Sequence, residues 1–322
     1  MPYIPVDIEP AFPQPIVGEG VRPKLLELLG LDDLPDEIEF TIDPPREEGS
    51  LRVSNARFAN SLGETVPAIL CIPQNNGETL AGVVCVPGTS NNAEIVTDPD
   101  FREEPDSGSL YGWGRELARR GFATLSITAK GTVTRRASVE EWATENKLLN
   151  PYGRQQMGVL VDETLRAARI LTTLEGVDPG RIGLTGWSLG GSATWYGAAC
   201  APWIAAAVPV MGGVGSMARA IHEGDVHRAS AYFYIPHMLR FFDHAQIVAD
   251  CIAPRPFMMV APTMDQDMPL SGVEDLKPIV RQAYEAAGHP ERFKVYQPES
   301  THVYLAEYFE WVAAWLKEYL RS

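Results

Sequence analysis

The sequence has too few basic residues to balance its acidic ones. It holds 27 lysine and arginine residues against 42 aspartate and glutamate residues, so its formal net charge at pH 7 is −15. Proteins that bind nucleic acid or anionic membrane surfaces present a basic face, so this balance argues against both partners. We therefore expect a small molecule, with no nucleic acid and no membrane, as the partner.

Long apolar runs and closely spaced cysteines are also missing. No stretch approaches the roughly 18 apolar residues of a transmembrane helix, and the N-terminus lacks the basic and apolar segments of a signal peptide. The four cysteines, at positions 71, 85, 200 and 251, form no C-x-x-C pair. We expect buried, reduced thiols in a cytoplasmic protein, and the composition leaves open whether the chain forms a homo-oligomer.

Proline recurs through the first 45 residues. Because proline has no backbone N–H and fixes its own φ, such a stretch resists regular structure. We predict one short helix near residues 24–29 and otherwise irregular chain. The predicted organisation is an arm of residues 1–49 that packs on a larger domain of residues 50–322.

After residue 50, apolar strand-like segments alternate with helical ones. The predicted strands cover residues 65–73, 80–87, 122–128, 181–185, 204–210, 256–262 and 292–298. The predicted helices cover residues 110–120, 155–174, 189–200, 272–287 and 304–320. This alternation predicts a doubly wound α/β fold, in which a mostly parallel twisted sheet has helices on both faces. Residues 129–154 and 212–250 interrupt the pattern, and we interpret them as lid insertions.

Three glycines, Gly186, Gly190 and Gly191, surround Ser188 in the segment TGWSLGGSA. Glycine this dense disfavours both helix and strand, which indicates a special backbone geometry. Since the segment follows the predicted strand 181–185, we interpret it as a nucleophile elbow, where a strand turns sharply into a helix. A glycine-rich turn with an incidental serine is the alternative, so the rest of the chain has to decide.

Two further polar residues follow predicted strands nearer the C-terminus. Asp265 lies after strand 256–262, and His302 lies after strand 292–298. A serine hydroxyl becomes a nucleophile when a histidine takes its proton, and an acid orients that histidine. We therefore predict Ser188, Asp265 and His302 as catalytic residues, with Asp267 as the alternative acid.

Such chemistry also needs N–H donors for the oxyanion that forms on the substrate. One donor is expected from the backbone of Leu189, which follows Ser188 at the start of a helix. The second is expected from the backbone of Thr89, in the polar turn after strand 80–87. The alternative is that this turn has no role beyond reversing the chain.

From about residue 50 onward the chain resembles the α/β-hydrolase superfamily. The matching segments are VDPGRIGLTG, GWSLGG, IAPRPFMMV, DQDMP and THVY. They are most similar to the branch that holds dienelactone-hydrolase-like and acetyl-xylan-esterase-like enzymes, near the prolyl-oligopeptidase catalytic domain. The resemblance implies that residues 50–322 form an α/β-hydrolase catalytic domain with a serine–acid–histidine triad.

Two other patterns point elsewhere but are weak. His222, His227, His237 and His244 gather in the second insertion without the spacing of a metal site, so no metal is expected. The segment GGVGSMA partly matches a dinucleotide fingerprint. It lies late in the predicted sheet without a convincing βαβ unit after it, so no cofactor is expected.

Three side chains are candidates for the substrate pocket. Trp187 lies within the elbow, Trp113 lies in helix 110–120, and Arg154 ends the first insertion. Aromatic rings could stack on a sugar or an aromatic acid, but they also suit an ordinary core. The sequence does not identify the substrate.

Together these features predict a serine hydrolase that cleaves carboxylic esters through an acyl-enzyme. Small acyl or acetyl esters, including those of carbohydrates, and lactones are the expected substrates. A peptidase or amidase of the prolyl-oligopeptidase type uses the same machinery and is the first alternative. The second is a non-catalytic binding protein on a hydrolase fold, because a fold does not determine a function.

Overall fold

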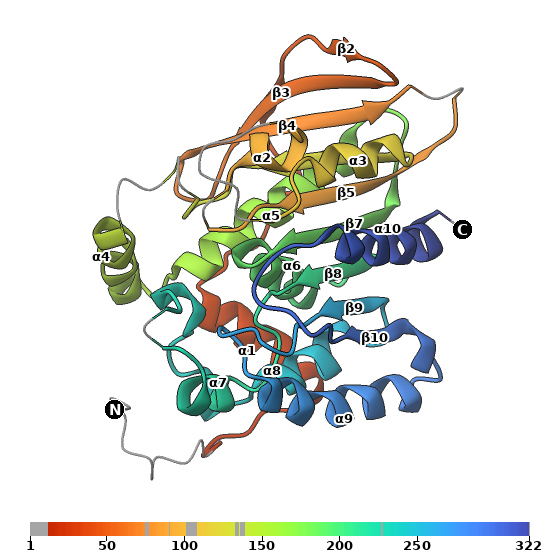
Figure 1. Cartoon of the computed structure of the whole chain (residues 1–322). Coiled ribbons are helices and arrows are strands. Elements are labelled where there is room, and N and C mark those ends of the chain that lie inside the picture. The colour runs from red at the N-terminus through yellow and green to blue at the C-terminus, as the bar shows by residue number, and fades with distance from the viewer. Residues whose placement is uncertain are drawn as a thin grey trace.

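The computed structural model describes residues 12–74, 77–89, 91–100, 108–132, 135, 139–226 and 228–321. Ten strands in this part of the chain form one sheet in the order β1-β3-β4-β6-β5-β7-β8-β9-β10, with β2 paired to β3. Helices lie on both faces of the sheet (Figure 1). The doubly wound α/β fold predicted from the alternation of strands and helices is therefore confirmed.

The strands differ in direction between the two halves of the sheet. They are β1 (Phe40–Ile42), β2 (Arg46–Glu48), β3 (Leu51–Ala59), β4 (Thr65–Pro73), β5 (Leu80–Val86), β6 (Phe122–Ile127), β7 (Val177–Trp187), β8 (Ala206–Val210), β9 (Phe257–Val260) and β10 (Phe293–Tyr296). Strands β5 to β10 pair parallel with one another, whereas β1 to β4 pair antiparallel, and β4 joins the halves by pairing with β6. Strand β5 is buried along its whole length, as expected between two helical layers.

The helices divide between two apolar layers. They are α1 (Val21–Leu29), α2 (Ala93–Thr97), α3 (Trp113–Arg119), α4 (Val139–Leu149), α5 (Gln156–Thr173), α6 (Leu189–Cys200), α7 (Met217–Glu223), α8 (His244–Ile247), α9 (Leu270–Ala286) and α10 (Ala306–Leu320). One core cluster joins the sheet to α1, α5, α6 and α9, and another joins it to α3 and α10. Leu160, Ala167 and Leu171 of α5 are buried in the first cluster, as their helical spacing predicts.

The N-terminal segment contributes to the sheet. Strands β1 and β2 both pair with β3, and α1 packs Val21, Leu25 and Leu29 into the same core as α5 and α6. The boundary predicted between residues 49 and 50 falls in the turn from β2 to β3. The division of the chain into an arm and a catalytic domain stays a prediction.

The two predicted insertions both leave the sheet after a parallel strand. Residues 129–154 follow β6 and include α4, and residues 212–250 follow β8 and include α7, α8 and a short 3-10 turn at Ala231–Phe233. Helix α4 contacts that turn, so the insertions meet. Figure 1 shows α4 and α7 on the same side of the molecule.

A buried ion-pair network fixes the start of the first insertion. Glu163 of α5 is fully buried, and Arg135 donates to both of its carboxylate oxygens at 2.8 Å. The N–H of Lys130 and the side chain of Asn60 also donate to Glu163, each at 2.8 Å. A buried carboxylate is costly unless it is paired in this way, so the network holds the start of the insertion against α5.

The cysteines are buried, as predicted. All four cysteines are buried and none forms a disulfide. Burial raises the pKa of Cys71 to about 11, so that thiol stays protonated and unreactive at neutral pH. Within the described residues, no helix combines the length and apolar character needed to cross a membrane.

Candidate active site

Ser188 occupies a strained position between β7 and α6. Its backbone has φ 55° and ψ −117°, a conformation that residues other than glycine rarely adopt. The Ser188 N–H donates to the carbonyl of Val210 at 2.9 Å, which ties the turn to the end of β8. A serine held on a strained turn from strand to helix is the geometry of a nucleophile elbow.

The glycines around Ser188 allow backbone segments to touch. A Cβ added to Gly190 would lie 2.0 Å from the carbonyl oxygen of Val86, and one added to Gly191 would lie 2.7 Å from Cα of Gly212. Both contacts are with backbone, which cannot move aside as a flexible side chain can. The dense glycines are therefore explained by close approach of the elbow to the ends of β5 and β8.

His302 links Ser188 to an acid. Its Nε2 lies 2.8 Å from Ser188 Oγ, and its Nδ1 lies 3.0 Å from Oδ1 of Asp265. Asp265 follows β9 and His302 follows β10, so both lie beyond the carboxyl ends of adjacent parallel strands. The structure thus brings together the three residues predicted as catalytic. Proton transfer from serine to histidine needs this order of contacts.

Asp267 lies near His302 but in a weaker position than Asp265. Its Oδ2 is 3.6 Å from His302 Nδ1, and its Oδ1 accepts from Arg228 Nε at 2.7 Å. The N–H of Asp267 donates to Asp265 Oδ1 at 3.0 Å, so one loop holds both carboxylates close together. The Asp265 side chain is 4% exposed, against 23% for Asp267. Distance and burial both favour Asp265 as the partner of the imidazole.

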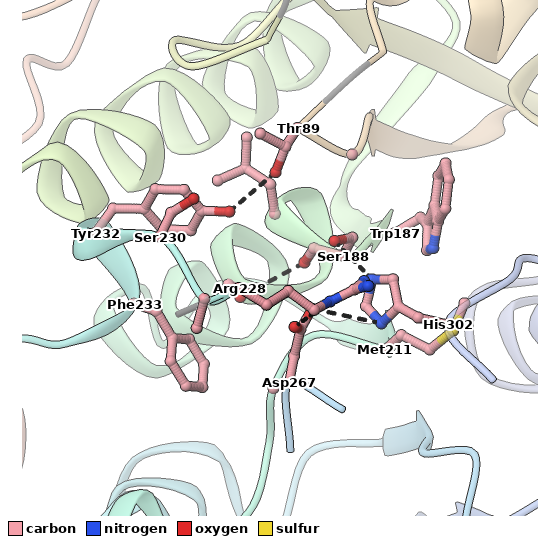
Figure 2. A pocket seen from close by; sticks show the side chains of 15 residues that line it. Thr89, Trp187, Ser188, Met211, Arg228, Ser230, Tyr232, Phe233, Asp267 and His302 are labelled. Atoms are coloured by element: carbon pink, nitrogen blue, oxygen red, sulfur yellow. Dashed lines mark hydrogen bonds and ion pairs between the residues drawn. The ribbon is translucent and has the colours of Figure 1, made fainter. Parts of the chain in front are cut away.

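A cavity of about 310 Å³ opens beside Ser188 (Figure 2). Its wall includes Trp187 from the elbow, Met211 from the end of β8, and a group of residues from the second insertion. The insertion contributes Gly213, Arg228, Ala229, Ser230, Tyr232 and Phe233. The sequence predicts that residues 212–250 form a lid, but the pattern of this segment does not indicate which of its residues face Ser188.

The predicted oxyanion donors border the same cavity. Leu189 is the first residue of α6, and Thr89 lies in the turn after β5; both line the cavity with Ser188. Gly88 approaches closely, since a Cβ added to it would lie 3.5 Å from Ser188 Cβ. Within the described chain, neither the Leu189 N–H nor the Thr89 N–H has an acceptor. The first N–H groups of a helix have no partner in that helix and attract negative charge.

The side chain of Thr89 connects this turn to the insertion. Its Oγ1 lies 2.9 Å from the hydroxyl of Tyr232, and Tyr232 is largely buried in the cavity wall. This contact links the turn after β5 to the second insertion across the cavity (Figure 2).

Sequence profiles of two families match parts of the chain. The family described as acetyl xylan esterase matches residues 155–252, and the family described as Abhydrolase matches residues 217–315. A protein of Bacillus subtilis (strain 168) named "Putative hydrolase YtaP" is 25% identical over 288 residues, which cover 87% of this chain and 92% of that protein. The chain is an α/β-hydrolase. Its sequence similarity is to acetyl xylan esterases.

Solved structures share the fold of this α/β-hydrolase. A glucuronoyl esterase from Solibacter usitatus superposes with a TM-score of 0.71 at 13% identity, over 98% of each chain. An acetyl xylan esterase from Paenibacillus sp. R4 superposes with a TM-score of 0.65 at 17% identity, over 98% of this chain and 100% of that one. At such identities the likeness establishes the fold, and the chemistry has to be argued from the site.

Two of the three residues predicted to shape the pocket of the hydrolase do not line the cavity. Trp113 is buried in the core. Its ring packs edge-on against that of Tyr304, with the ring centroids 5.6 Å apart. Arg154 points to the N-terminal segment and pairs with Asp32 and the carbonyl of Gly30. Trp187 does line the cavity. Apolar aromatic residues and ion-paired arginines look alike in sequence whether they face a site or a structural contact.

The histidines of the second insertion that the structure describes do not converge on one point. His227 lies outside the described residues. Of the other three, His244 is fully buried, with Nε2 3.2 Å from the hydroxyl of Tyr196 and its ring 4.7 Å from that of Trp195. Among the described residues, the acidic and histidine side chains that do converge are Asp265, Asp267 and His302, whose nitrogen and oxygen atoms lie within 4.8 Å of one another.

His244 gives a testable dependence of stability on pH. Burial lowers its pKa below the ordinary value, and the charge of Asp243 only partly offsets this. The unfolded chain therefore takes up a proton at this histidine, near pH 6.5, before the folded protein does. The free energy of unfolding should fall by up to about 1 kcal/mol between pH 7.0 and 5.5 through this one group.

Urea unfolding at the two pH values measures the effect. His244→Gln should lose less stability on acidification than the unchanged protein does, whatever its stability at pH 7.0. His289→Gln is the matched control, because that histidine is 39% exposed. Equal acid losses in the unchanged protein and in His244→Gln would contradict the prediction.

Proposed function

We propose that this α/β-hydrolase cleaves carboxylic esters through an acyl-enzyme formed on Ser188, with His302 as general base and Asp265 as the acid that orients it. The observation that carries the proposal is the run of contacts from Ser188 Oγ through His302 to Asp265, at 2.8 and 3.0 Å. The strained backbone of Ser188 and the cavity beside it support the same assignment.

In the first half-reaction, Ser188 Oγ attacks the ester carbonyl carbon. The Oγ–C bond forms as His302 Nε2 takes the hydroxyl proton, and the carbonyl oxygen becomes an oxyanion. The N–H groups of Leu189 and Thr89, two residues that line the cavity, would donate to that oxygen. The C–O bond to the alcohol then breaks, and His302 returns the proton to the leaving oxygen.

In the second half-reaction, water replaces the alcohol. His302 Nε2 takes a proton from the water as its oxygen attacks the acyl carbon. Collapse of the second oxyanion breaks the bond to Ser188 Oγ, and His302 returns the proton to the serine. Asp265 accepts from Nδ1 throughout and keeps Nε2 facing Ser188.

The substrate class follows from cavity size and from the relatives. A cavity of about 310 Å³ is at the small end for ligand pockets, which supports a small acyl or acetyl group over a peptide. Similar proteins are named for acetyl xylan and glucuronoyl esters. We therefore infer small carboxylic esters, among them acetylated carbohydrates, and we do not favour the peptidase or amidase alternative.

Covalent labelling separates this proposal from a non-catalytic binding role. An alkyl fluorophosphonate should react once per chain, as a bond forms from Ser188 Oγ to phosphorus and fluoride leaves. Peptide mapping should place the label on Ser188, and p-nitrophenyl acetate should be hydrolysed at a rate that falls with the extent of labelling. An unlabelled Ser188, with no hydrolysis of p-nitrophenyl or acetylated sugar esters, would reject the enzyme assignment.

A further inference from the structure

Arg228 brings a positive charge into the wall of the cavity. It lies in the second insertion, and its Nε donates to Asp267 Oδ1 at 2.7 Å. Among the described residues that line the cavity, it alone is a lysine or arginine. Figure 2 shows its side chain extending from the side of Tyr232 and Phe233 toward His302. Asp267 thus lies between the guanidinium of Arg228 and the imidazole of His302, which contacts Ser188.

The terminal nitrogens of Arg228 remain available for a ligand. The salt bridge to Asp267 is made by Nε, and neither Nη1 nor Nη2 has an acceptor in the part of the chain that the structure describes. The side chain is 43% exposed, so these atoms can be reached. The two Nη groups of a guanidinium form a fork that matches the two oxygens of a carboxylate.

The surroundings hold this fork in place and keep it charged. The hydrogen bond to Asp267 and the charges of Asp267, Asp265 and Asp225 raise the pKa of Arg228 above its ordinary value. The N–H of Arg228 also donates to Asp225, at 3.2 Å from Oδ1, which anchors its backbone. Because the chain has a net charge of −15, a positive charge in the wall of the cavity calls for a specific explanation.

We propose that Arg228 binds a carboxylate group of the substrate, so that this hydrolase prefers esters that carry an acidic group close to the scissile bond. The inference rests on the proposed ester hydrolysis and names its substrate class more closely. The carboxylate could belong to the acyl group, as in a half-ester of a dicarboxylic acid, or to the alcohol, as in an ester of a hydroxy acid. Both sources present the same chemistry to the fork, and the test below separates them.

Matched pairs of esters measure the preference. On the acyl side, mono-p-nitrophenyl succinate is compared with p-nitrophenyl butyrate, which has a methyl group in place of the carboxylate. On the alcohol side, 3-carboxyphenyl acetate is compared with 3-carbamoylphenyl acetate. The unchanged enzyme should favour the acidic member of one pair by about tenfold or more in kcat/KM, and the pair that shows this identifies the source.

Substitution of Arg228 should abolish that preference. Arg228→Gln should reduce the kcat/KM ratio of acidic to neutral ester by about tenfold or more, mainly through KM for the acidic ester. Arg228→Lys should recover part of the ratio, because it keeps the charge and loses the fork. Arg219→Gln is the matched control: Arg219 lies in the same insertion, is 46% exposed, and pairs through Nε with Asp275 at 2.7 Å, outside the cavity. It should leave the ratio unchanged.

Three outcomes would overturn the inference. If the unchanged enzyme cleaves neutral and acidic esters equally, no carboxylate is recognised. If Arg228→Gln lowers kcat/KM for both members of a pair alike, Arg228 has a structural role only. In both cases hydrolysis itself stands. If no ester is cleaved and Ser188 is not labelled by fluorophosphonate, the proposed function fails first, and the inference fails with it.

Discussion

Ser188→Ala should lower kcat for ester hydrolysis by about 10⁴-fold to 10⁶-fold while the protein stays folded. The substitution removes the attacking oxygen, which lies 2.8 Å from His302 Nε2. Members of a catalytic triad act as a unit, so the remaining histidine and acid cannot compensate for that loss. Steady-state hydrolysis of p-nitrophenyl acetate measures the change, and circular dichroism with thermal unfolding checks the fold.

Ser192→Ala is the control for that experiment. Ser192 also lines the cavity and lies one turn further along α6, where its hydroxyl donates to the carbonyl of Gly212 at 3.0 Å. Loss of this hydrogen bond should lower the free energy of unfolding by about 1 kcal/mol. The alkyl fluorophosphonate should still label Ser188. If Ser188→Ala kept most of its esterase activity, the nucleophile would have to lie elsewhere.

Asp265→Asn should lower kcat by about 10⁴-fold, far more than Asp267→Asn does. Asp265 accepts from His302 Nδ1 at 3.0 Å, and an asparagine there can offer its amide N–H₂ to that nitrogen instead. The imidazole would then carry its proton on Nε2, where it cannot accept one from Ser188, which is the effect of the same change in serine proteases.

The paired variant Asp267→Asn separates orientation from general charge. It removes the same negative charge from a carboxylate that is 3.6 Å from His302 and is also bonded to Arg228. Activity within about tenfold of the unchanged enzyme is expected for Asp267→Asn on neutral esters. The reverse ranking of the two variants would transfer the role of the acid to Asp267.

The residues nearest the chemistry could be predicted because the chain order and the fold constrain them. Ser188 stands out through the glycines that its tight turn requires, and His302 follows β10, which runs parallel to β9 and ends at the same edge of the sheet. The choice between Asp265 and Asp267 could only be weighed by spacing, since both follow β9. Their distances to Nδ1, 3.0 and 3.6 Å, depend on how one loop folds.

The outer parts of the site and the N-terminal strands could not be predicted in this way. Strand β2 reads Arg-Glu-Glu and is held by pairing with β3, so its own residues give no strand signal. Trp113 and Arg154 have side chains suited to a pocket but meet structural partners instead. Arg228 gives no local pattern at all, because its position depends on the path of an insertion across the ends of the strands.

The cavity of this enzyme is assembled from separate parts of the chain. The side chains proposed to react, Ser188, Asp265 and His302, follow β7, β9 and β10, whereas much of the opposite wall comes from residues 212–250. An exchange of residues 212–250 between homologous enzymes would therefore transfer substrate preference and leave the proposed catalytic residues unchanged. Such a chimera should fold and keep its activity if it retains two ion pairs between residues 212–250 and the rest of the chain. These are Arg228–Asp267 and Arg219–Asp275.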